Sequence, residues 1–282
     1  MTSTTIVPFA EEHVAGAAAL LAERATRQRA AEPLLSLDDA RTALEALVGA
    51  KDVSGNVAVR GDAVAAFALA RLGDHPLFGA NAWIGSAGCA TSDPELLRDV
   101  YAAAAGEWFR DGYRRHYVNV PALPDELDPW YRLGFQHMHV QTALRETRAE
   151  PAAPNGFSIR ETRLEDLDDM VRTDLLIFEQ QRGSPSFGLV DIDADVEERR
   201  ADWAEALADE RFRHFVAERD GRIVGHSGLG PADPEFAIPA DAIDLASTAV
   251  EPSQRGMGVG VALTLHAFGW AAAQGYPVIQ TS

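Results

Sequence analysis

The stretch that decides the fold reads Asp244-Leu-Ala-Ser-Thr-Ala-Val-Glu-Pro-Ser-Gln-Arg-Gly-Met-Gly-Val-Gly260, and it continues as Val261-Ala-Leu-Thr-Leu-His-Ala-Phe-Gly-Trp270. This order predicts a strand, a glycine loop and a helix. Glycines at 256, 258 and 260 allow a tight turn and a close approach of the backbone to a ligand. The helix behind them begins with free N–H groups and the positive end of its dipole. A plain strand-to-helix turn would fit the glycines alone, but the whole arrangement suits a phosphate or pyrophosphate.

Length and composition bound the protein class. The chain has 282 residues, of which 46% are hydrophobic, enough for about two packed domains of ~100–200 residues each. Cys89 is the only cysteine, which excludes an intrachain disulfide and a zinc site built on several cysteines. The N-terminal residues have no basic region of a signal peptide, and no apolar run is long enough for a membrane span. We therefore expect a cytoplasmic protein without a membrane partner.

The net charge of the chain indicates which partners it can bind. The net charge is −18, and residues 151–282 carry 11 Arg and Lys against 23 Asp and Glu. Such a field repels nucleic acid and tolerates cationic small molecules such as amines, although an acidic surface also serves solubility. After Arg222 the only basic residue is Arg255, inside the glycine loop. A lone positive charge beside a helix N-terminus is well suited to a ligand anion.

The chain reads as two copies of one α/β unit with a mixed sheet, residues 1–148 and 157–282, joined by a linker at 149–156. In the first copy we expect helices at 10–31, 37–48, 94–111 and 125–133, and strands at 5–8, 56–60, 63–72, 80–90, 117–120 and 136–146. In the second we expect helices at 164–179, 194–209 and 258–273, and strands at 157–161, 212–219, 222–228, 242–250 and 277–280.

The repeat shows two differences between the copies. The loop at 92–98 of the first copy has no glycine and two acids, so we expect it not to hold pyrophosphate. The first copy continues for about 25 residues after its strand at 117–120, whereas the sequence stops at Ser282 after the equivalent strand. The second domain is thus expected to be incomplete at its C-terminus, with an exposed sheet edge. A missing tail, a segment swapped from a partner, or a homodimer would cover it.

The second half resembles the GNAT superfamily of acyl-CoA-dependent N-acyltransferases. The resemblance rests on Arg255-Gly-Met-Gly258-Val-Gly260, which follows Val250-Glu-Pro and precedes an Ala-Leu helix. The first half resembles the same fold less closely, through Tyr131-Arg-Leu-Gly134-Phe135 before a closing strand. Together the halves are similar to a tandem pair in which only the second copy keeps the glycine loop.

The resemblance implies which residues bind acetyl-CoA as a cosubstrate. Backbone groups of three strand residues would pair with the pantetheine arm: Thr248, Ala249 and Val250. The loop amides would bind the pyrophosphate, from Arg255, Gly256, Met257, Gly258, Val259 and Gly260. The tyrosine that often protonates the thiolate in this family lies in a segment that the second copy lacks, so the general acid stays unassigned.

Asp244 is the candidate general base. It lies six residues before Val250, the offset at which histone-type members of the family carry a glutamate base. Residues 244, 246, 248 and 250 share one face of a regular strand, so the carboxylate would face the thioester cleft. A carboxylate that caps or pairs locally is the alternative reading of Asp244, and Glu251 is the alternative base.

Other polar residues are candidates for contact with the acceptor or for binding a metal ion. His226 on the hairpin, the loop at 180–188 and the acids Asp174 and Glu179 are candidates for contact with a cationic acceptor. His137 and His139 alternate on one strand, but two ligands do not make a metal site, so no metal is expected.

These observations predict an N-acetyltransferase that moves an acetyl group from acetyl-CoA to the amine of a small molecule. The first domain would be an inactive copy that supports the fold and the acceptor site. The alternative is a CoA-binding or scaffold protein without turnover. A dinucleotide-binding module fits poorly, because a Rossmann loop follows the first strand of its unit and this loop follows the fourth.

Overall fold

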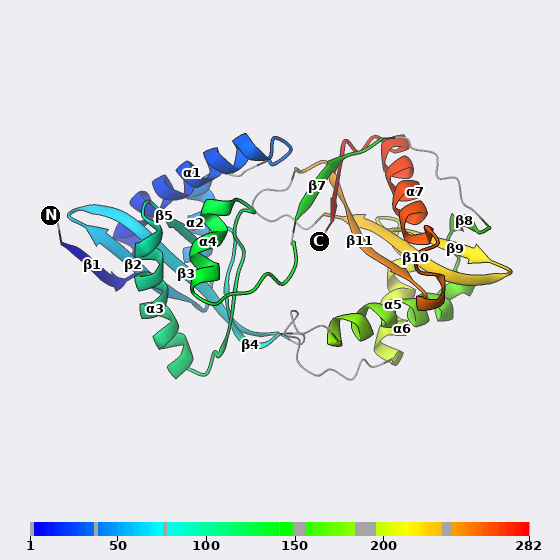
Figure 1. The fold of residues 1–282 in the computed structure, drawn as a ribbon, viewed down its shortest axis with the longest axis horizontal. Helices are drawn as coiled ribbons and strands as arrows, with labels where there is room; N and C mark the ends of the chain where they lie inside the picture. Colours follow the sequence, from blue (N-terminus) through cyan, green and yellow to red (C-terminus); the bar gives the residue numbers. More distant parts are fainter. Residues whose placement is uncertain are drawn as a thin grey trace. The chain divides into compact units, whose positions relative to one another are not determined.

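A computed structural model describes residues 3–36, 39–75, 78–140, 142–148, 156–183, 196–232 and 239–281. The chain divides into two units, Met1–His137 and Met138–Ser282. Each unit is built on one mixed β-sheet with helices on both faces, as Figure 1 shows. The predicted α/β class with two similar halves is confirmed.

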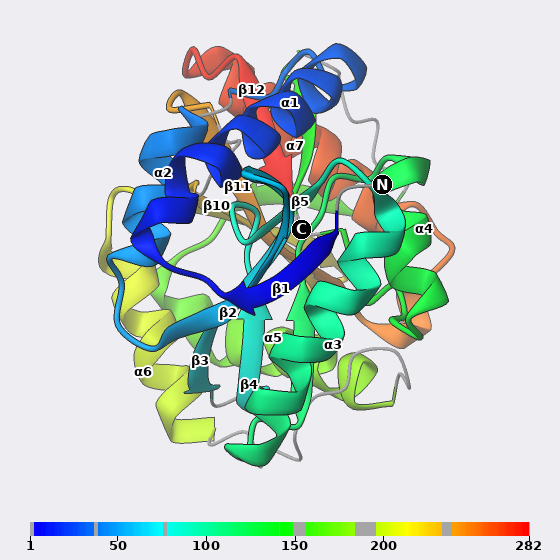
Figure 2. The same cartoon turned by 90° about the vertical axis from the view of Figure 1, so that its left-hand side faces the viewer.

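The sheet of the first unit follows the order β1 (Thr4–Pro8), β2 (Val53–Arg60), β3 (Ala63–His75), β4 (Gly79–Ile84) and β6 (Arg115–Val118), with β5 (Cys89–Thr91) also paired to β3. After the short helix η1 (Glu11–His13), α1 (Val14–Ala31) and α2 (Ala40–Val48) pack on one face. The other face carries α3 (Pro94–Arg110) and α4 (Pro124–Arg132). Figure 2 shows α1 and α3 on opposite sides of the strands.

The strand predicted at 80–90 is divided into β4 and β5. Residues 85–88 leave the ladder, and the carbonyl of Gly88 accepts a hydrogen bond from Leu69 N at 2.7 Å. A Cβ at Gly88 would lie 2.5 Å from the carbonyl oxygen of Leu69, so the close approach requires glycine. The buried Arg24 guanidinium donates to the carbonyls of Ser86 and Cys89 and holds the break in place. The segment Gly85-Ser-Ala-Gly88 interrupts the apolar run, and it was a readable sign of this break.

The sheet of the second unit follows the order β7 (Ala143–Glu146), β12 (Val278–Thr281), β11 (Ala242–Val250), β10 (Arg222–Pro231), β9 (Arg213–Arg219) and β8 (Ser158–Glu161). Short helices η2 (Leu164–Asp166) and η3 (Pro252–Gln254) precede α5 (Leu167–Arg182) and α7 (Val259–Ala273). Helix α7 packs on one face of the sheet, and α5 with α6 (Val196–Ala208) packs on the other. From β8 to β12 the order repeats that of the first unit, including a parallel outer pair.

Alternating side chains explain how one strand serves both faces. In β9, Phe215 and Ala217 belong to the core under α7, whereas Val216 between them belongs to the core under α5 and α6. Successive side chains of a strand point to opposite faces of the sheet. A strand that is buried on both faces therefore needs apolar residues at both odd and even positions. All three residues are at most 2% exposed.

The strand predicted to close the first domain pairs elsewhere, so that expectation is wrong. From Glu146 opposite Val278 to Ala143 opposite Thr281, β7 runs antiparallel to β12 in the second unit. Leu144 is buried, and Thr147 N donates to the carbonyl of Pro277 at 2.9 Å. The edge of β12 that we expected to be exposed is covered by this strand. The four residues Ala143-Leu-Arg-Glu146 are too few to specify a partner strand, and an open backbone edge accepts any strand that reaches it.

The division at His137 and Met138 lies before the predicted linker, so β7 belongs with the second unit. Residues 149–155 of that linker lie outside the described residues.

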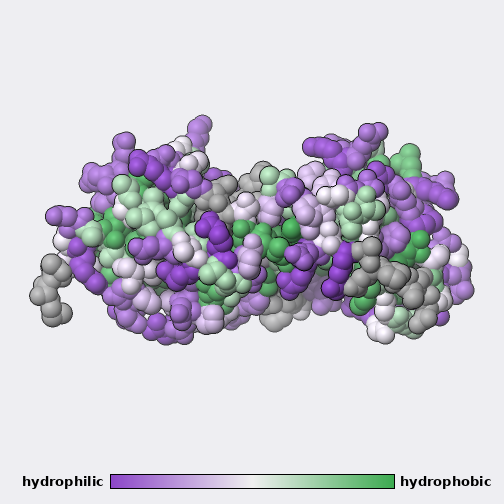
Figure 3. Space-filling model, turned by 90° about the horizontal axis from the view of Figure 1, so that it is seen from above, coloured by the Kyte–Doolittle hydropathy of each residue, from purple (hydrophilic) through white to green (hydrophobic). Residues whose placement is uncertain are grey.

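The many charged residues of the described chain lie largely on its surface. Hydrophilic residues cover much of the face seen in Figure 3, with hydrophobic residues in smaller groups between them. None of the helices in the described residues is both long and apolar enough to cross a lipid bilayer.

We expect Leu144→Ala to weaken the second unit by about 2 kcal/mol or more, because truncation of a buried leucine loses transfer free energy and leaves a cavity. Amide hydrogen exchange should accelerate at residues 278–281 of β12 and stay unchanged at residues 115–118 of β6. Arg145→Ala, at the exposed neighbouring position, is the control and should leave both segments protected. Faster exchange in β6 alone would contradict the pairing of β7 with β12.

Candidate functional site

The glycine loop has two positions that require glycine for its backbone conformation. Gly256 has a φ of 78° and Gly258 a φ of 84°, in the left-handed region that other residues rarely adopt. In the described chain, nothing lies within 4 Å of a Cβ built at either position, so the space over the loop is open. Gly260 lies inside α7, where an added Cβ would make an ordinary contact of 3.6 Å with Val250. At this third position neither the turn nor the packing requires glycine.

The N-terminus of α7 has no side-chain cap. Gly258 is its N-cap residue, and its first turn contains no acidic side chain. The N–H groups of a first helical turn have no partners within the helix, and they carry the positive end of its dipole. An anion is the complementary ligand for such a terminus.

The equivalent helix of the first unit is already capped. Asp93 accepts a hydrogen bond from the Glu95 amide at 3.1 Å, and Pro94 removes one further N–H group at the start of α3. Arg60 pairs with the same carboxylate at 3.0 Å. The first unit thus presents its own carboxylate where the second presents free amides.

Strand β11 is paired on both sides for only part of its length. Its parallel pairing with β12 runs from Ala242 opposite Val278 to Leu245 opposite Thr281. Among the described residues, positions 247–250 pair with β10 alone, and Ala246 lies opposite no residue of β10 or β12. The backbone of residues 248–250 is therefore open on the β12 side, where an extended ligand can pair like an added strand. A 3.5 Å contact from Arg255 Nε to the Val250 carbonyl lies at the end of this open stretch.

A β-bulge at Ala246 changes the phase of β11. Gly228 of β10 pairs with Ser247, and the next residue, Leu229, pairs with Leu245, so Ala246 is the extra residue. Before the bulge, Ile243 and Leu245 join the core under α7, and after it Val250 packs against that same core. The prediction that residues 244, 246, 248 and 250 share one face is therefore wrong.

The bulge places Asp244 on the face of α5 and α6. Asp244 is half-buried and lies opposite Gly230 of β10 and Gln280 of β12. A Cβ at Gly230 would lie 2.5 Å from the ring of Phe212, so that ring lies over the strand beside Asp244. Ser247 is on the same face, since its Oγ would lie 3.2 Å from a Cβ at Gly228 and on the side of His214.

His226 lies beneath this face and is fully buried. Its Nδ1 is 2.7 Å from Thr173 Oγ1, which itself lies 2.8 Å from the Asp169 carbonyl. Because the hydroxyl proton goes to that carbonyl, we assign the imidazole proton to Nδ1. Burial lowers the pKa of His226 to about 3, so the ring is neutral. The ring of Trp203 covers it at 5.4 Å, so the predicted contact of His226 with a substrate is not seen.

His214 is a second neutral histidine on the same face. Trp203 meets its ring edge-on at 5.0 Å, and Phe212 stacks parallel to it at 6.2 Å. Burial lowers the pKa of His214 to about 4. Two buried imidazoles without charge therefore line the interior of the face that carries Asp244.

Glu251, the alternative base, forms two ion pairs through one carboxylate oxygen. Its Oε1 accepts from Arg172 of α5 and from Arg222 of β10, the latter at 3.1 Å. Its own N–H donates to the Val224 carbonyl at 2.9 Å, and its side chain is 12% exposed. Glu251 thus fastens the start of the loop to a helix and a strand, which is a positioning role rather than that of a free base.

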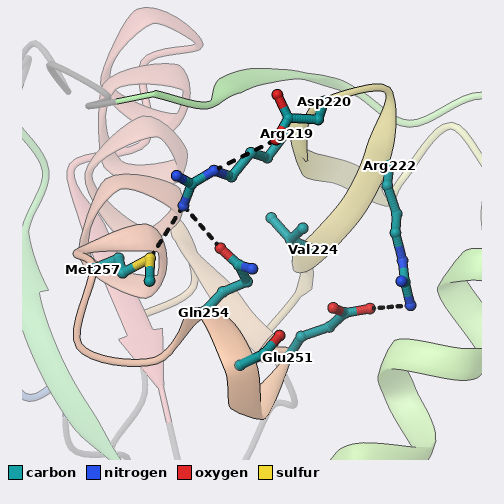
Figure 4. A pocket seen from close by; sticks show the side chains of 8 residues that line it. Arg219, Asp220, Arg222, Val224, Glu251, Gln254 and Met257 are labelled. Atoms are coloured by element: carbon teal, nitrogen blue, oxygen red, sulfur yellow. Dashed lines mark hydrogen bonds and ion pairs between the residues drawn. The ribbon is translucent and has the colours of Figure 1, made fainter.

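A hollow of about 450 Å³ lies between the β9–β10 turn and the loop after β11. Figure 4 shows Arg219 and Arg222 reaching into this arginine hollow from the turn, with Gln254 and Met257 on the loop side. Sequence analysis missed it, although two arginines that flank the Asp220-Gly221 turn were a readable signal.

The residues predicted to contact the acceptor lie in different surroundings. Asp174 is buried, its pKa is raised by burial, and its carboxylate lies 3.8 Å from Arg199, so it faces α6. Glu179 is exposed, and Gln180 Oε1 lies 3.5 Å from Arg255 Nη1. Residues 184–188 of the predicted acceptor loop lie outside the described residues. Those described include no cluster of three or more His, Cys, Asp or Glu suited to a metal ion.

Comparisons with known proteins agree with this geometry. Residues 177–281 match the acetyltransferase (GNAT) family. A GCN5-related glucosamine N-acetyltransferase region of a fungal multidomain β-N-acetylglucosaminidase aligns over 99% of this chain and 35% of that one, with a TM-score of 0.53 and 10% identity. That likeness supports the two-unit fold over the whole length.

Two shorter structures align over less than half of the chain. One is an aminoglycoside N-acetyltransferase in complex with CoA, with 18% identity and a TM-score of 0.35 over 46% of this chain and 80% of that one. Another is an acetyltransferase from Clostridium acetobutylicum with acetyl-CoA, with 15% identity and a TM-score of 0.37 over 45% and 80%. No curated protein sequence matches the chain.

The two buried histidines predict a pH dependence of stability. Their pKa values, about 3 for His226 and about 4 for His214, are below the ordinary value of 6.5, so the unfolded chain binds more protons. The stabilisation is present above pH 6.5 and is lost as the pH falls towards 4, at roughly 1.4 kcal/mol per pH unit for each histidine.

Urea unfolding at pH 7, 6 and 5 measures this slope. We expect His226→Asn to flatten it, whereas His75→Asn, at an exposed position of the first unit, leaves it unchanged. An identical slope in the wild type and in His226→Asn would contradict the assignment of a neutral buried ring.

Proposed function

Because residues 177–281 belong to the GNAT family of acetyltransferases, we propose that this chain transfers an acetyl group from acetyl-CoA to the amino group of a small molecule. The supporting observation is a half-paired strand that leads directly into an uncapped glycine loop. Acetyl-CoA has two parts that match these features in the same order. Its extended arm carries amide groups that can pair with the strand, and its pyrophosphate can bind at the loop.

In this proposal the second unit alone binds acetyl-CoA. The open backbone of Thr248, Ala249 and Val250 pairs with the pantetheine arm. The amides of residues 255–260 bind the pyrophosphate, with the dipole of α7 behind them. The first unit supports the fold without binding, because the carboxylate of Asp93 occupies the N-terminus of α3 and would repel a phosphate.

Asp244 is the proposed general base. The carboxylate takes a proton from the ammonium form of the acceptor, directly or through one water molecule. The amine nitrogen then forms a bond to the acetyl carbon and the carbon–sulfur bond breaks. The nitrogen loses its second proton to solvent, and the leaving thiolate takes a proton from solvent. A backbone N–H of the unpaired stretch of β11 stabilises the negative oxygen that forms during attack.

The electrostatics of this face support a cationic acceptor. His214 and His226 are neutral at pH 7 because burial lowers the pKa of each ring. Asp244 supplies a negative charge, and residues 151–282 as a whole carry twelve more acidic than basic residues. An ammonium group meets little repulsion there, and the same carboxylate that attracts it can remove its proton.

Asp244→Asn tests this role. We expect kcat near pH 7 to fall by about 10²–10⁴-fold, the usual contribution of general-base assistance, while the Kd for CoA changes by less than about threefold. Release of free thiol from acetyl-CoA in the presence of a panel of small amines measures the rate. Turnover of the variant should recover partly as the pH rises, because a larger fraction of the amine is then already unprotonated.

Asp241→Asn is the matched control, since Asp241 is an exposed carboxylate three residues earlier. It should keep wild-type turnover. Wild-type rates in Asp244→Asn across the pH range would show that the base is elsewhere. CoA binding without thiol release for any amine would favour a binding protein without turnover.

A further inference from the structure

The arginine hollow lies beside the glycine loop and is not needed by the steps above. Met257 belongs to the loop and also lines the hollow, so the two features are neighbours. In Figure 4 the guanidinium of Arg219 reaches across the hollow towards the loop. An anion held by the loop amides and a second anion in the hollow would be adjacent groups of one ligand.

Arg219 has mainly neutral partners. Its Nη1 lies 3.0 Å from Gln254 Oε1 and 3.1 Å from Met257 Sδ. Its nearest carboxylate is that of Asp220 at 3.9 Å, on a side chain that is 96% exposed. A thioether is a weak acceptor, and a solvated carboxylate at that distance compensates little of the charge. A stronger acceptor can therefore displace these partners without leaving an unpaired charge behind.

The second arginine of the hollow shares its carboxylate. Arg222 pairs with Glu251 at 3.1 Å, but Arg172 donates to the same oxygen. Arg172 also pairs with Asp169 at 2.7 Å, so Arg172 and Arg222 together are balanced by two carboxylates. Arg219, whose nearest carboxylate is 3.9 Å away, is therefore the cation of the hollow that is least compensated.

We propose that the arginine hollow binds the 3′-phosphate of CoA and lets the enzyme distinguish CoA from its 3′-dephospho form. The inference rests on the proposed function, which places the pyrophosphate at residues 255–260. CoA carries a phosphomonoester on its ribose, close to the pyrophosphate along the molecule. Guanidinium groups bind phosphate oxygens through paired charge-assisted hydrogen bonds. Arg219 makes the main contact, and Arg222 adds a second charge.

Calorimetric titration of the full chain with CoA and with 3′-dephospho-CoA tests the assignment. The wild type should bind CoA at least tenfold more tightly. Arg219→Gln should weaken CoA binding by about tenfold or more and leave the affinity for 3′-dephospho-CoA unchanged, so that the two ligands become nearly equal. Arg222→Gln should reduce the preference in the same direction, and the Arg222 side chain is 67% exposed, so the substitution leaves the core intact.

Arg163→Gln is the matched control, because Arg163 is an exposed arginine of the same unit that pairs locally with Glu165. It should keep the full preference for CoA. Equal wild-type affinities for the two ligands would overturn the 3′-phosphate site and leave the proposed function standing. An equal loss for both ligands in Arg219→Gln and Arg222→Gln would also overturn it. No binding of either ligand to the wild type would remove the proposed function itself.

Discussion

The site depends on the incomplete pairing of β11. From Ile243 to Leu245 the strand is held by β10 and β12, and from Ser247 onward it is held by β10 alone. Backbone groups that no strand satisfies need water or a ligand, so the fold leaves a receptive edge in the middle of a sheet. The bulge at Ala246 lies at the same point, and it turns Asp244 to the face of α5 and α6 while Val250 stays under α7. One irregularity thus separates the residue proposed for proton transfer from the residues proposed to hold the cosubstrate.

The two units show how little has to change for one topology to gain or lose an anion site. In both, a helix lies in the connection between the two strands of the parallel outer pair, α3 between β4 and β6 and α7 between β11 and β12. In the first unit an aspartate caps that helix and a proline starts it, which satisfies the terminus internally. In the second, Gly258 leaves the terminus open, and Glu251 fastens the loop through Arg172 and Arg222 without entering it. The ion-paired carboxylate of Glu251 makes the base of the loop rigid, and the amides at the tip of the loop are the groups proposed to bind the anion.

Local signals predicted much of the fold. The turn at Asp220-Gly221 and the glycines at 256 and 258 were readable because positive φ angles restrict the residue type. The partner of β7 was not readable, because a strand of four residues fits any open edge. The bulge had a signal that was missed: Ile243 and Leu245 are apolar at odd positions and Val250 at an even one, so the period breaks between them. The contacts of Arg219 and Glu251 join segments far apart in the chain, and no local pattern specifies them.

The most direct test of this account is the number and place of CoA sites on the intact chain. Isothermal titration with CoA should give about one site per chain, and that site should be lost in Gly258→Asp. This substitution puts a carboxylate at the N-terminus of α7, where its charge would oppose the pyrophosphate as that of Asp93 does in the first unit. Ser92→Asp, at the corresponding loop of the first unit, should leave the titration unchanged. Two equivalent sites, or unchanged affinity in Gly258→Asp, would contradict the claim that the glycine loop of the second unit is the cosubstrate site.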